Sequence, residues 1–131
     1  NLKINSQISY KEVKKLIKKM DILLMPYTKK ATFSGDHGNI INFMSPMKMF
    51  DYLGSGKIIL SSDIKVLKEI LINNFNSILI KDFLNVYEWK KQIDNVDFKK
   101  KKYLNIKKNA ILTSLKFTWK KRANKLLKKI T

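Results

Sequence analysis

Hydrophobic residues along the chain fall into two patterns, short continuous runs and longer stretches with helical spacing. Continuous runs at residues 22–25, 58–60 and 77–80 predict buried strands of a parallel sheet. The run at 22–25, closed by Pro26, has the composition of a central strand buried on both faces. The chain opens on an apolar stretch, residues 1–4, which indicates the remnant of another strand. We therefore expect the chain to be part of a longer protein.

Stretches with helical spacing separate these runs. Most of them begin with residues that suit a helix start: the Ser9–Glu12 capping box, Pro46, Asp63, the Asn85–Glu88 pair and Thr118. Their expected apolar faces include Tyr10, Val13, Leu16, Ile17 and Met20; then Val66, Leu67, Ile70 and Leu71; then Tyr103, Ile106, Ala110 and Ile111; and finally Trp119, Ala123, Leu126, Leu127 and Ile130. The alternation predicts a single three-layer α/β domain that has a mainly parallel sheet and ends in two helices.

Residues 28–43 form the longest stretch without clear periodicity. A long loop directly after a strand is more often functional than decorative. His37, the only histidine, lies there beside Asp36, but a metal site needs further spaced ligands, so a plain loop residue is the simpler interpretation. Tyr27 and Phe33 either line a ligand cleft or pack the loop, and packing is again the simpler interpretation.

The segment most suggestive of chemistry is residues 45–57, which opens a helix between two predicted strands. In parallel α/β sheets, ligands bind beyond the carboxyl ends of the strands, where helix N-termini favour anions such as a diphosphate. Lys48, in the first turn, adds a positive charge. One turn further along, Asp51 is able to accept hydrogen bonds from the vicinal hydroxyls of a ribose. From spacing alone, the simpler interpretation is an exposed Lys48–Asp51 pair on the helix surface.

The order of residues resembles that of glycosyltransferase family 4. The resemblance is carried by Ser45-Pro46-Met47-Lys48-Met49-Phe50-Asp51-Tyr52-Leu53, which is similar to the family's donor-binding signature, by the strand 58–60 ending in Ser61-Ser62-Asp63, by Asn76-Ser77 and by Asp21-Ile22, Asn109-Ala110 and Phe117-Thr118-Trp119. These landmarks are collinear over nearly the whole chain. At the position of the family's first conserved glutamate this chain has Phe43, and at the second it has Asp51.

This resemblance implies a GT-B enzyme, in which two Rossmann-like domains face each other across a cleft. Residues 1–131 would be an incomplete C-terminal domain that binds the nucleotide-sugar donor. The whole enzyme would transfer a hexosyl-type sugar to an acceptor hydroxyl with retention at the anomeric carbon, in glycan or glycolipid (surface polysaccharide) synthesis. The missing N-terminal domain would hold the acceptor, and the chain alone would be inactive.

The resemblance also assigns binding residues. The backbone around Ser45, Pro46, Met47 and Lys48 would face the diphosphate, and Asp51 would bind the ribose. Ile8, after the first strand, would approach the nucleobase. No catalytic residue, metal or further cofactor is implied for this part of the enzyme, because the nucleotide-sugar is itself a substrate.

Charge is the most unusual global feature, with a net value of +18. Between Lys99 and Thr131 the chain has 13 basic residues and no Asp or Glu. Such a block is typical of a solvated face, of a nucleic-acid-binding surface or of contact with anionic lipid.

The nucleic-acid alternative rests on Tyr103, Phe117 and Trp119, which are interleaved with the lysines. Two features disfavour it: those aromatics have core spacing, and only one basic residue, Arg122, is an arginine. The membrane alternative fits an enzyme whose acceptor is lipid-linked, docked at the inner face of the cell membrane. The absence of cysteine fits a reducing cytoplasm.

Overall fold

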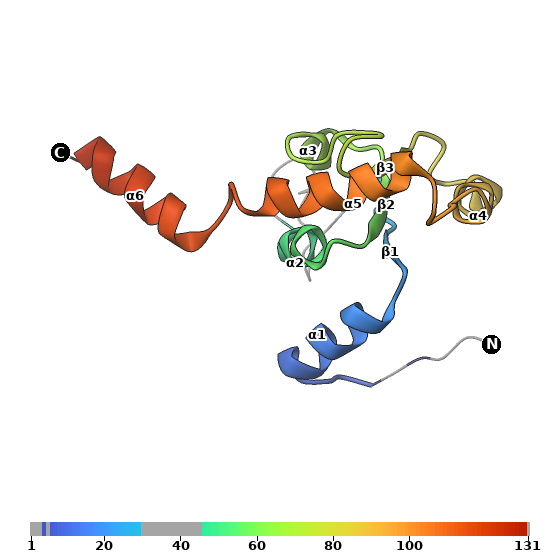
Figure 1. Ribbon diagram of the computed structural model, residues 1–131, viewed down its shortest axis with the longest axis horizontal. Coiled ribbons are helices and arrows are strands. Elements are labelled where there is room, and N and C mark those ends of the chain that lie inside the picture. Colours follow the sequence, from blue (N-terminus) through green and yellow to red (C-terminus); the bar gives the residue numbers. More distant parts are fainter. Residues whose placement is uncertain (1–3, 5, 30–45, 131) are drawn as a thin grey trace.

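The computed structural model describes residues 4, 6–29 and 46–130, and this part of the chain has an α/β fold (Figure 1). Its helices and strands in chain order are α1 (Tyr10–Lys19), β1 (Ile22–Met25), α2 (Met47–Ser55), β2 (Ile58–Ser62), α3 (Lys65–Lys68), β3 (Ile78–Ile80), α4 (Val86–Asp94), α5 (Lys101–Ser114) and α6 (Trp119–Ile130). The fold is Rossmann-like and ends in helices, as the alternating pattern predicts.

The described strands form one parallel sheet in the order β1-β2-β3. Ile22 of β1 is paired with Ile58 of β2, and Leu60 of β2 is paired with Ile78 of β3. Every residue of β2 is buried, as expected for a strand with neighbours on both edges and helices on both faces.

The prediction that residues 22–25 form a central strand is wrong for the described part of the chain. There β1 is an edge strand, and the Leu24 side chain is 41% exposed. A continuous apolar run predicts that a segment forms a strand, but it does not indicate how many strands lie beside it in the sheet. The central position belongs to β2.

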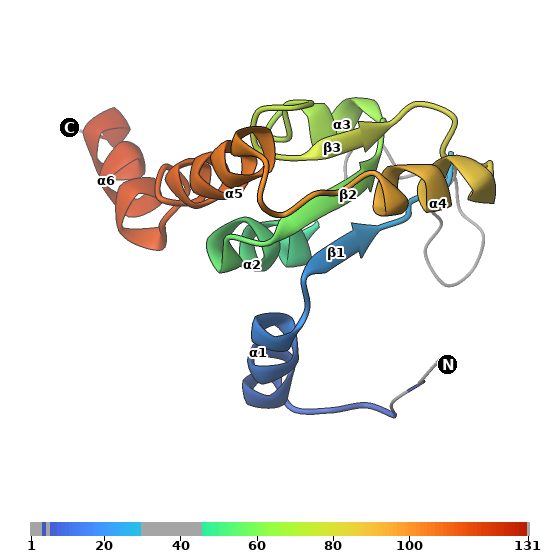
Figure 2. The same ribbon diagram turned by 45° about the vertical axis from the view of Figure 1, so that its right-hand side comes forward.

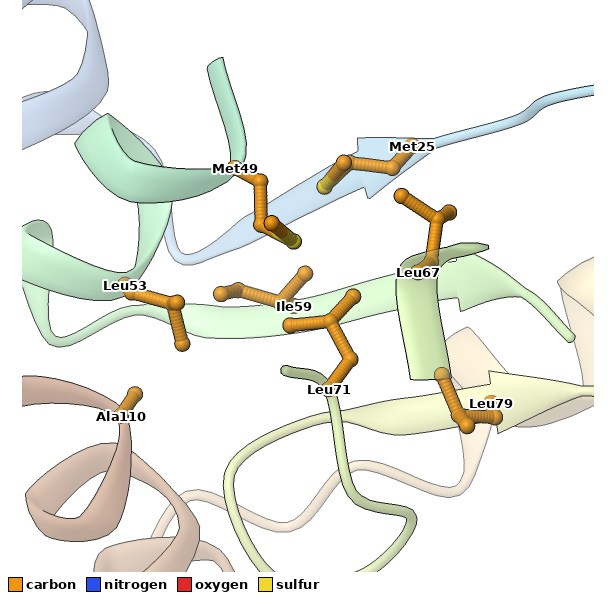
Figure 3. Close-up of a cluster of buried hydrophobic side chains, with 8 residues drawn as sticks. All are labelled: Met25, Met49, Leu53, Ile59, Leu67, Leu71, Leu79 and Ala110. Atoms are coloured by element: carbon orange, nitrogen blue, oxygen red, sulfur yellow. The ribbon is translucent and has the colours of Figure 1, made fainter. Parts of the chain in front are cut away.

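Two clusters of apolar side chains cover the two faces of the sheet. The first contains Met25, Met49, Leu53, Ile59, Leu67, Leu71, Leu79 and Ala110, and Figure 3 shows these side chains converging from α2, α3, α5 and the strands. The second contains Ile58, Leu60, Ile78, Ile80, Tyr103 and Ile106, with Trp89 and Ile93 of α4 packed against it. Side chains alternate along β2, so Ile59 belongs to one cluster and Ile58 and Leu60 to the other.

A buried asparagine ties the chain before β3 to α5. Asn76 is fully buried, and its side-chain oxygen accepts a hydrogen bond from the Ile72 N–H at 2.7 Å. Its amide group donates to the Ile70 carbonyl at 2.9 Å and to Thr113 Oγ1 at 3.1 Å. Because this one buried amide pairs with two backbone groups of the turn and with a side chain of α5, it fixes the turn against the helix.

Helix α2 begins where the sequence predicts, and it ends at a glycine. Pro46 is its N-cap residue, and Gly56 ends it in the left-handed conformation with φ of 64°. A Cβ atom at Gly56 would lie 2.7 Å from Ile111 Cδ1, so the glycine also allows α2 to end close against α5.

Three of the predicted helix caps are confirmed. Ser9 and Glu12 form the capping box of α1, the Asn85 side chain accepts from the Tyr87 N–H, and Thr118 Oγ1 accepts from the Lys121 N–H at 3.3 Å. Glu88 does not complete a capping box with Asn85. Its Oε1 lies 3.9 Å from Lys91 Nζ instead.

The predicted cap by Asp63 is wrong. The Asp63 N–H donates to the Ile80 carbonyl at 3.0 Å, which keeps this residue in line with the sheet. Helix α3 therefore begins one residue after Ile64, which provides no side-chain cap. The Asp63 carboxylate forms an ion pair with Lys68 at 2.6 Å. Helix α3 is also short, although Leu67 and Leu71 are buried as expected.

The last two helices differ in their packing. In α5 the predicted residues Tyr103, Ile106 and Ala110 are buried, whereas Ile111 is exposed and Thr113 takes the next buried position. In both views α6 extends beyond the end of α5, away from the sheet (Figures 1 and 2).

Candidate functional site

The carboxyl ends of β1 and β2 are locked together by a reciprocal pair of hydrogen bonds. The Tyr27 N–H donates to Ser62 Oγ at 2.9 Å, and the same hydroxyl donates to the Tyr27 carbonyl at 2.7 Å. Ser62 is fully buried, so the segment that leaves β1 is held against the end of β2. Because the strands are parallel, their carboxyl ends lie together, and this carboxyl edge is where such folds bind ligands.

Helix α2 presents its N-terminus at this edge. Lys48, in the first turn, has its Nζ 5.6 Å from the centroid of the Tyr27 ring. No side chain in the described part of the chain caps this helix start, and its first turn has no acidic residue. The helix end and the lysine therefore combine to make the edge electropositive. Burial raises the pKa of the half-buried Tyr27 hydroxyl, which stays protonated and remains a hydrogen-bond donor.

Asp51 lies one turn further along α2 and contacts α1 rather than Lys48. Its Oδ1 accepts a hydrogen bond from the Tyr10 hydroxyl at 2.7 Å, and this bond raises the pKa of Tyr10. Lys48 and Asp51, both described by the structure, form no ion pair with each other. The simple surface pair that the spacing suggests is therefore absent. A carboxylate has several acceptor positions, so Asp51 keeps capacity for further donors.

The structure places the predicted site residues as follows. Pro46, Met47 and Lys48 lie together at the start of α2, and Asp51 lies one turn away. Ile8 is half-buried beside α1, where it lines a shallow depression formed by α1 itself, with none of the α2 residues. Ser45 lies outside the described residues.

Sequence reasoning missed three residues at this edge. Tyr10 was assigned to the packing face of α1, yet its hydroxyl reaches Asp51 across 41 residues of sequence. The sequence favours a packing role for Tyr27 and indicates no role for Ser62. A signal for Ser62 did exist, because a hydroxyl at the end of an otherwise apolar strand needs a partner when it is buried.

Metal binding has no structural support in the described ranges. No three histidine, aspartate or glutamate side chains there come close enough to hold an ion. His37 and Asp36, the pair noted in the sequence, lie outside these ranges, as do Phe33 and Phe43.

Comparison with known protein families finds no match for the chain, and comparison with curated proteins finds none either.

Proposed function

We propose that this chain binds the nucleotide-sugar donor of a glycosyltransferase, with the diphosphate at the N-terminus of α2. The observation that carries the proposal is the position of Lys48 against Tyr27, at the carboxyl edge of a parallel sheet. The resemblance of residues 45–57 to the family 4 donor signature supports the same location.

The chemistry of the site suits a nucleoside diphosphate. The amides at the start of α2, with Lys48, attract the phosphates. Asp51 accepts hydrogen bonds from the ribose hydroxyls, while Tyr10 holds its carboxylate in one orientation. Tyr10 is a positioning residue in this scheme, because it acts through Asp51.

In the transfer reaction, the bond between the anomeric carbon and the diphosphate oxygen breaks. The acceptor hydroxyl oxygen forms the new bond to that carbon and loses its proton. Negative charge then builds on the leaving diphosphate, and this chain's contribution is to stabilise that charge electrostatically. The acceptor and the remaining contacts to the sugar belong to a second domain, so the 131-residue chain alone is expected to transfer no sugar. We place the reaction in the cytoplasm.

Binding of nucleoside diphosphates tests the proposal directly. We would titrate the chain with UDP, GDP and ADP by calorimetry. We expect one of them to bind saturably, and Asp51→Ala or Lys48→Ala to weaken it about 10- to 100-fold, because hydrogen bonds to charged groups contribute about 1.5–3 kcal/mol.

The matched control is Lys90→Ala and Asp94→Ala. These residues form an exposed ion pair on α4, and their replacement makes the same charge changes away from the site. Equal losses of affinity in both sets of variants would contradict the assignment of the site to α2. No binding of any diphosphate would contradict the proposed function.

Of the three aromatic residues that support the nucleic-acid alternative, packing buries one and covers another in part. Tyr103 is buried, and its hydroxyl donates to the Asn95 carbonyl at 2.8 Å. Phe117 packs against Phe50, with ring centroids 5.7 Å apart. Tyr103 is therefore not placed to stack on a base, whereas Phe117 keeps 48% of its surface exposed. A single-stranded oligonucleotide in the same titration covers this alternative.

A further inference from the structure

Helix α6 is amphipathic, and its apolar face is uncovered in the described structure. The spacing of Trp119, Ala123, Leu126 and Leu127 places them on one side of the helix. The side chains of Trp119, Leu126 and Leu127 are 73%, 55% and 61% exposed. Monomeric proteins rarely expose contiguous apolar surface without a use for it, so this face is suited to a partner.

The rest of α6 is basic. Lys120, Lys121, Arg122, Lys125 and Lys128 lie on the same helix, and no acidic residue occurs anywhere after Asp97. A partner of this helix must therefore offer an apolar interior and a negatively charged surface together. Nucleic acid offers the charge and bases that stack on an aromatic ring such as Trp119, but it has no apolar interior for Leu126 and Leu127.

A cavity of about 450 Å³ lies where α5 turns into α6. Met47 and Phe50 of α2 form part of its apolar wall, and the cations around it are Lys116, Lys121, Arg122 and Lys125. Among the described residues that line the cavity there is no acidic side chain. Lys121 Nζ donates to the Leu115 carbonyl at 2.7 Å, and the Arg122 guanidinium lies 5.5 Å from the Trp119 ring, so these two long side chains are held in place.

We propose that α6 and this cavity dock the chain on an anionic lipid bilayer. Trp119, Leu126 and Leu127 enter the boundary between headgroups and acyl chains, where amphipathic helices with basic faces lie. The basic residues meet the phosphates of a negatively charged leaflet, which attracts each of them. In this proposal the cavity holds one lipid phosphate between its cations. No helix in the described ranges is long and apolar enough to cross a bilayer, so the contact is peripheral.

This inference does not rest on the proposed donor site. The residues that carry it lie on α6 and around the cavity, and Lys48 and Asp51 of α2 do not line the cavity, although Met47 at the start of α2 belongs to both sites. Vesicle binding without any nucleotide is therefore expected to be unchanged by Asp51→Ala. Failure of either idea leaves the other standing.

Sedimentation with lipid vesicles tests the inference on the 131-residue chain. Vesicles of phosphatidylcholine mixed with phosphatidylglycerol are compared with vesicles of phosphatidylcholine alone, at several salt concentrations. We expect binding to the mixed vesicles that weakens as salt rises, and much weaker binding to the neutral ones. Absence of binding, equal binding to both, or complete displacement from the vesicles by a single-stranded oligonucleotide would overturn the proposal.

Charge reversal locates the surface. The double variant Lys121→Glu with Lys125→Glu is expected to weaken vesicle binding about 30-fold or more, since each change removes an attraction and adds a repulsion. The matched variant Lys15→Glu with Lys18→Glu places the same charge change on exposed positions of α1 and is expected to have a much smaller effect. Equal losses in the two variants would show a general charge effect and overturn the docking site.

Tryptophan fluorescence tests the apolar half of the inference. The chain has two tryptophans, so Trp89→Phe leaves Trp119 as the only reporter. Because Trp89 Nε1 donates to the Phe83 carbonyl at 2.9 Å, circular dichroism should first establish that this variant folds. We expect a blue shift of Trp119 emission on mixed vesicles and quenching by brominated lipid. Unshifted emission with bound vesicles would show that α6 does not enter the bilayer.

Discussion

Helices α5 and α6 are both rich in lysine and both have an apolar face, but only that of α5 is covered. Tyr103, Ile106 and Ala110 of α5 are buried against the sheet and α2. The corresponding face of α6 is exposed, and the helix extends away from the sheet (Figure 2). Periodicity therefore predicts a helix and its apolar side equally well in both cases. Whether other residues cover the apolar side of α6 depends on the direction of the chain after Ser114, and periodicity does not predict that direction.

Truncation of one apolar residue in each helix should give the largest difference in stability between variants of α5 and α6. Ile106→Ala removes a fully buried side chain and is expected to lower the free energy of unfolding by about 3–4 kcal/mol. Leu126→Ala, on the exposed face of α6, is expected to change it by no more than about 0.5 kcal/mol. Urea denaturation measures both. A large loss in the α6 variant would mean that its face is covered in solution.

The buried amide that holds α5 gives the next largest effect. Asn76→Ala leaves the Ile72 N–H, the Ile70 carbonyl and Thr113 Oγ1 without this partner, so we expect a loss of about 3 kcal/mol. Asn109→Ala is the matched control, because its amide donates to the Phe75 carbonyl from a more accessible position. We expect a loss of about 1 kcal/mol or less there. Similar urea midpoints for the two variants would argue against a special role for Asn76.

The close contact between α2 and α5 is expected to be sensitive to a single added methyl group. Gly56→Ala puts a side chain at a left-handed backbone position, which costs about 1–2 kcal/mol, and crowds the end of Ile111. Gly54→Ala is a suitable control, because its new methyl group would have only Ser114 Oγ nearby, at 3.8 Å. Thermal unfolding should separate the two variants. Equal melting temperatures would contradict the packing at Gly56.

The smallest expected effect is a difference between the N-terminal caps of α1 and α6 in how much stability each loses as pH falls. Hydrogen bonds from the Ser9 hydroxyl and N–H lower the pKa of Glu12. A lowered pKa in the folded state stabilises the helix above the ordinary glutamate pKa, and this stability is lost as pH falls through the folded value. The Thr118 cap of α6 has no titrating group.

NMR amide exchange measures this difference. In acid we expect the first turn of α1 to lose protection while the first turn of α6 is unchanged. Glu12→Gln should remove the pH dependence in α1. Parallel loss of protection in both helices would point to general acid unfolding instead.

The sequence predicts local features of this fold well, because each depends on neighbouring residues. The capping box at Ser9 and the helix start at Pro46 both follow from local backbone chemistry. The edge position of β1 and the role of Asp63 depend on pairing with distant strands, so the local pattern predicts both wrongly.

In the candidate site, too, the sequence predicts the features that depend on neighbouring residues and misses the contacts between distant elements. Pro46, Met47 and Lys48 are neighbours in sequence and must lie together at a helix start. The contacts of Tyr10 with Asp51 and of Tyr27 with Ser62 each join separate elements, so no local pattern indicates them. The identity of the ligand stays a prediction that the titrations above can decide.

The hydrogen bond between Tyr10 and Asp51 has a thermodynamic consequence. It joins α1 to the helix whose N-terminus faces the carboxyl edge of the sheet. Any ligand that hydrogen-bonds to Asp51 must therefore share the carboxylate with Tyr10 or displace it, and in each case the docking of α1 changes in strength. Coupling of this kind is reciprocal, so a partner that holds α1 in place changes the affinity of that ligand by the same factor.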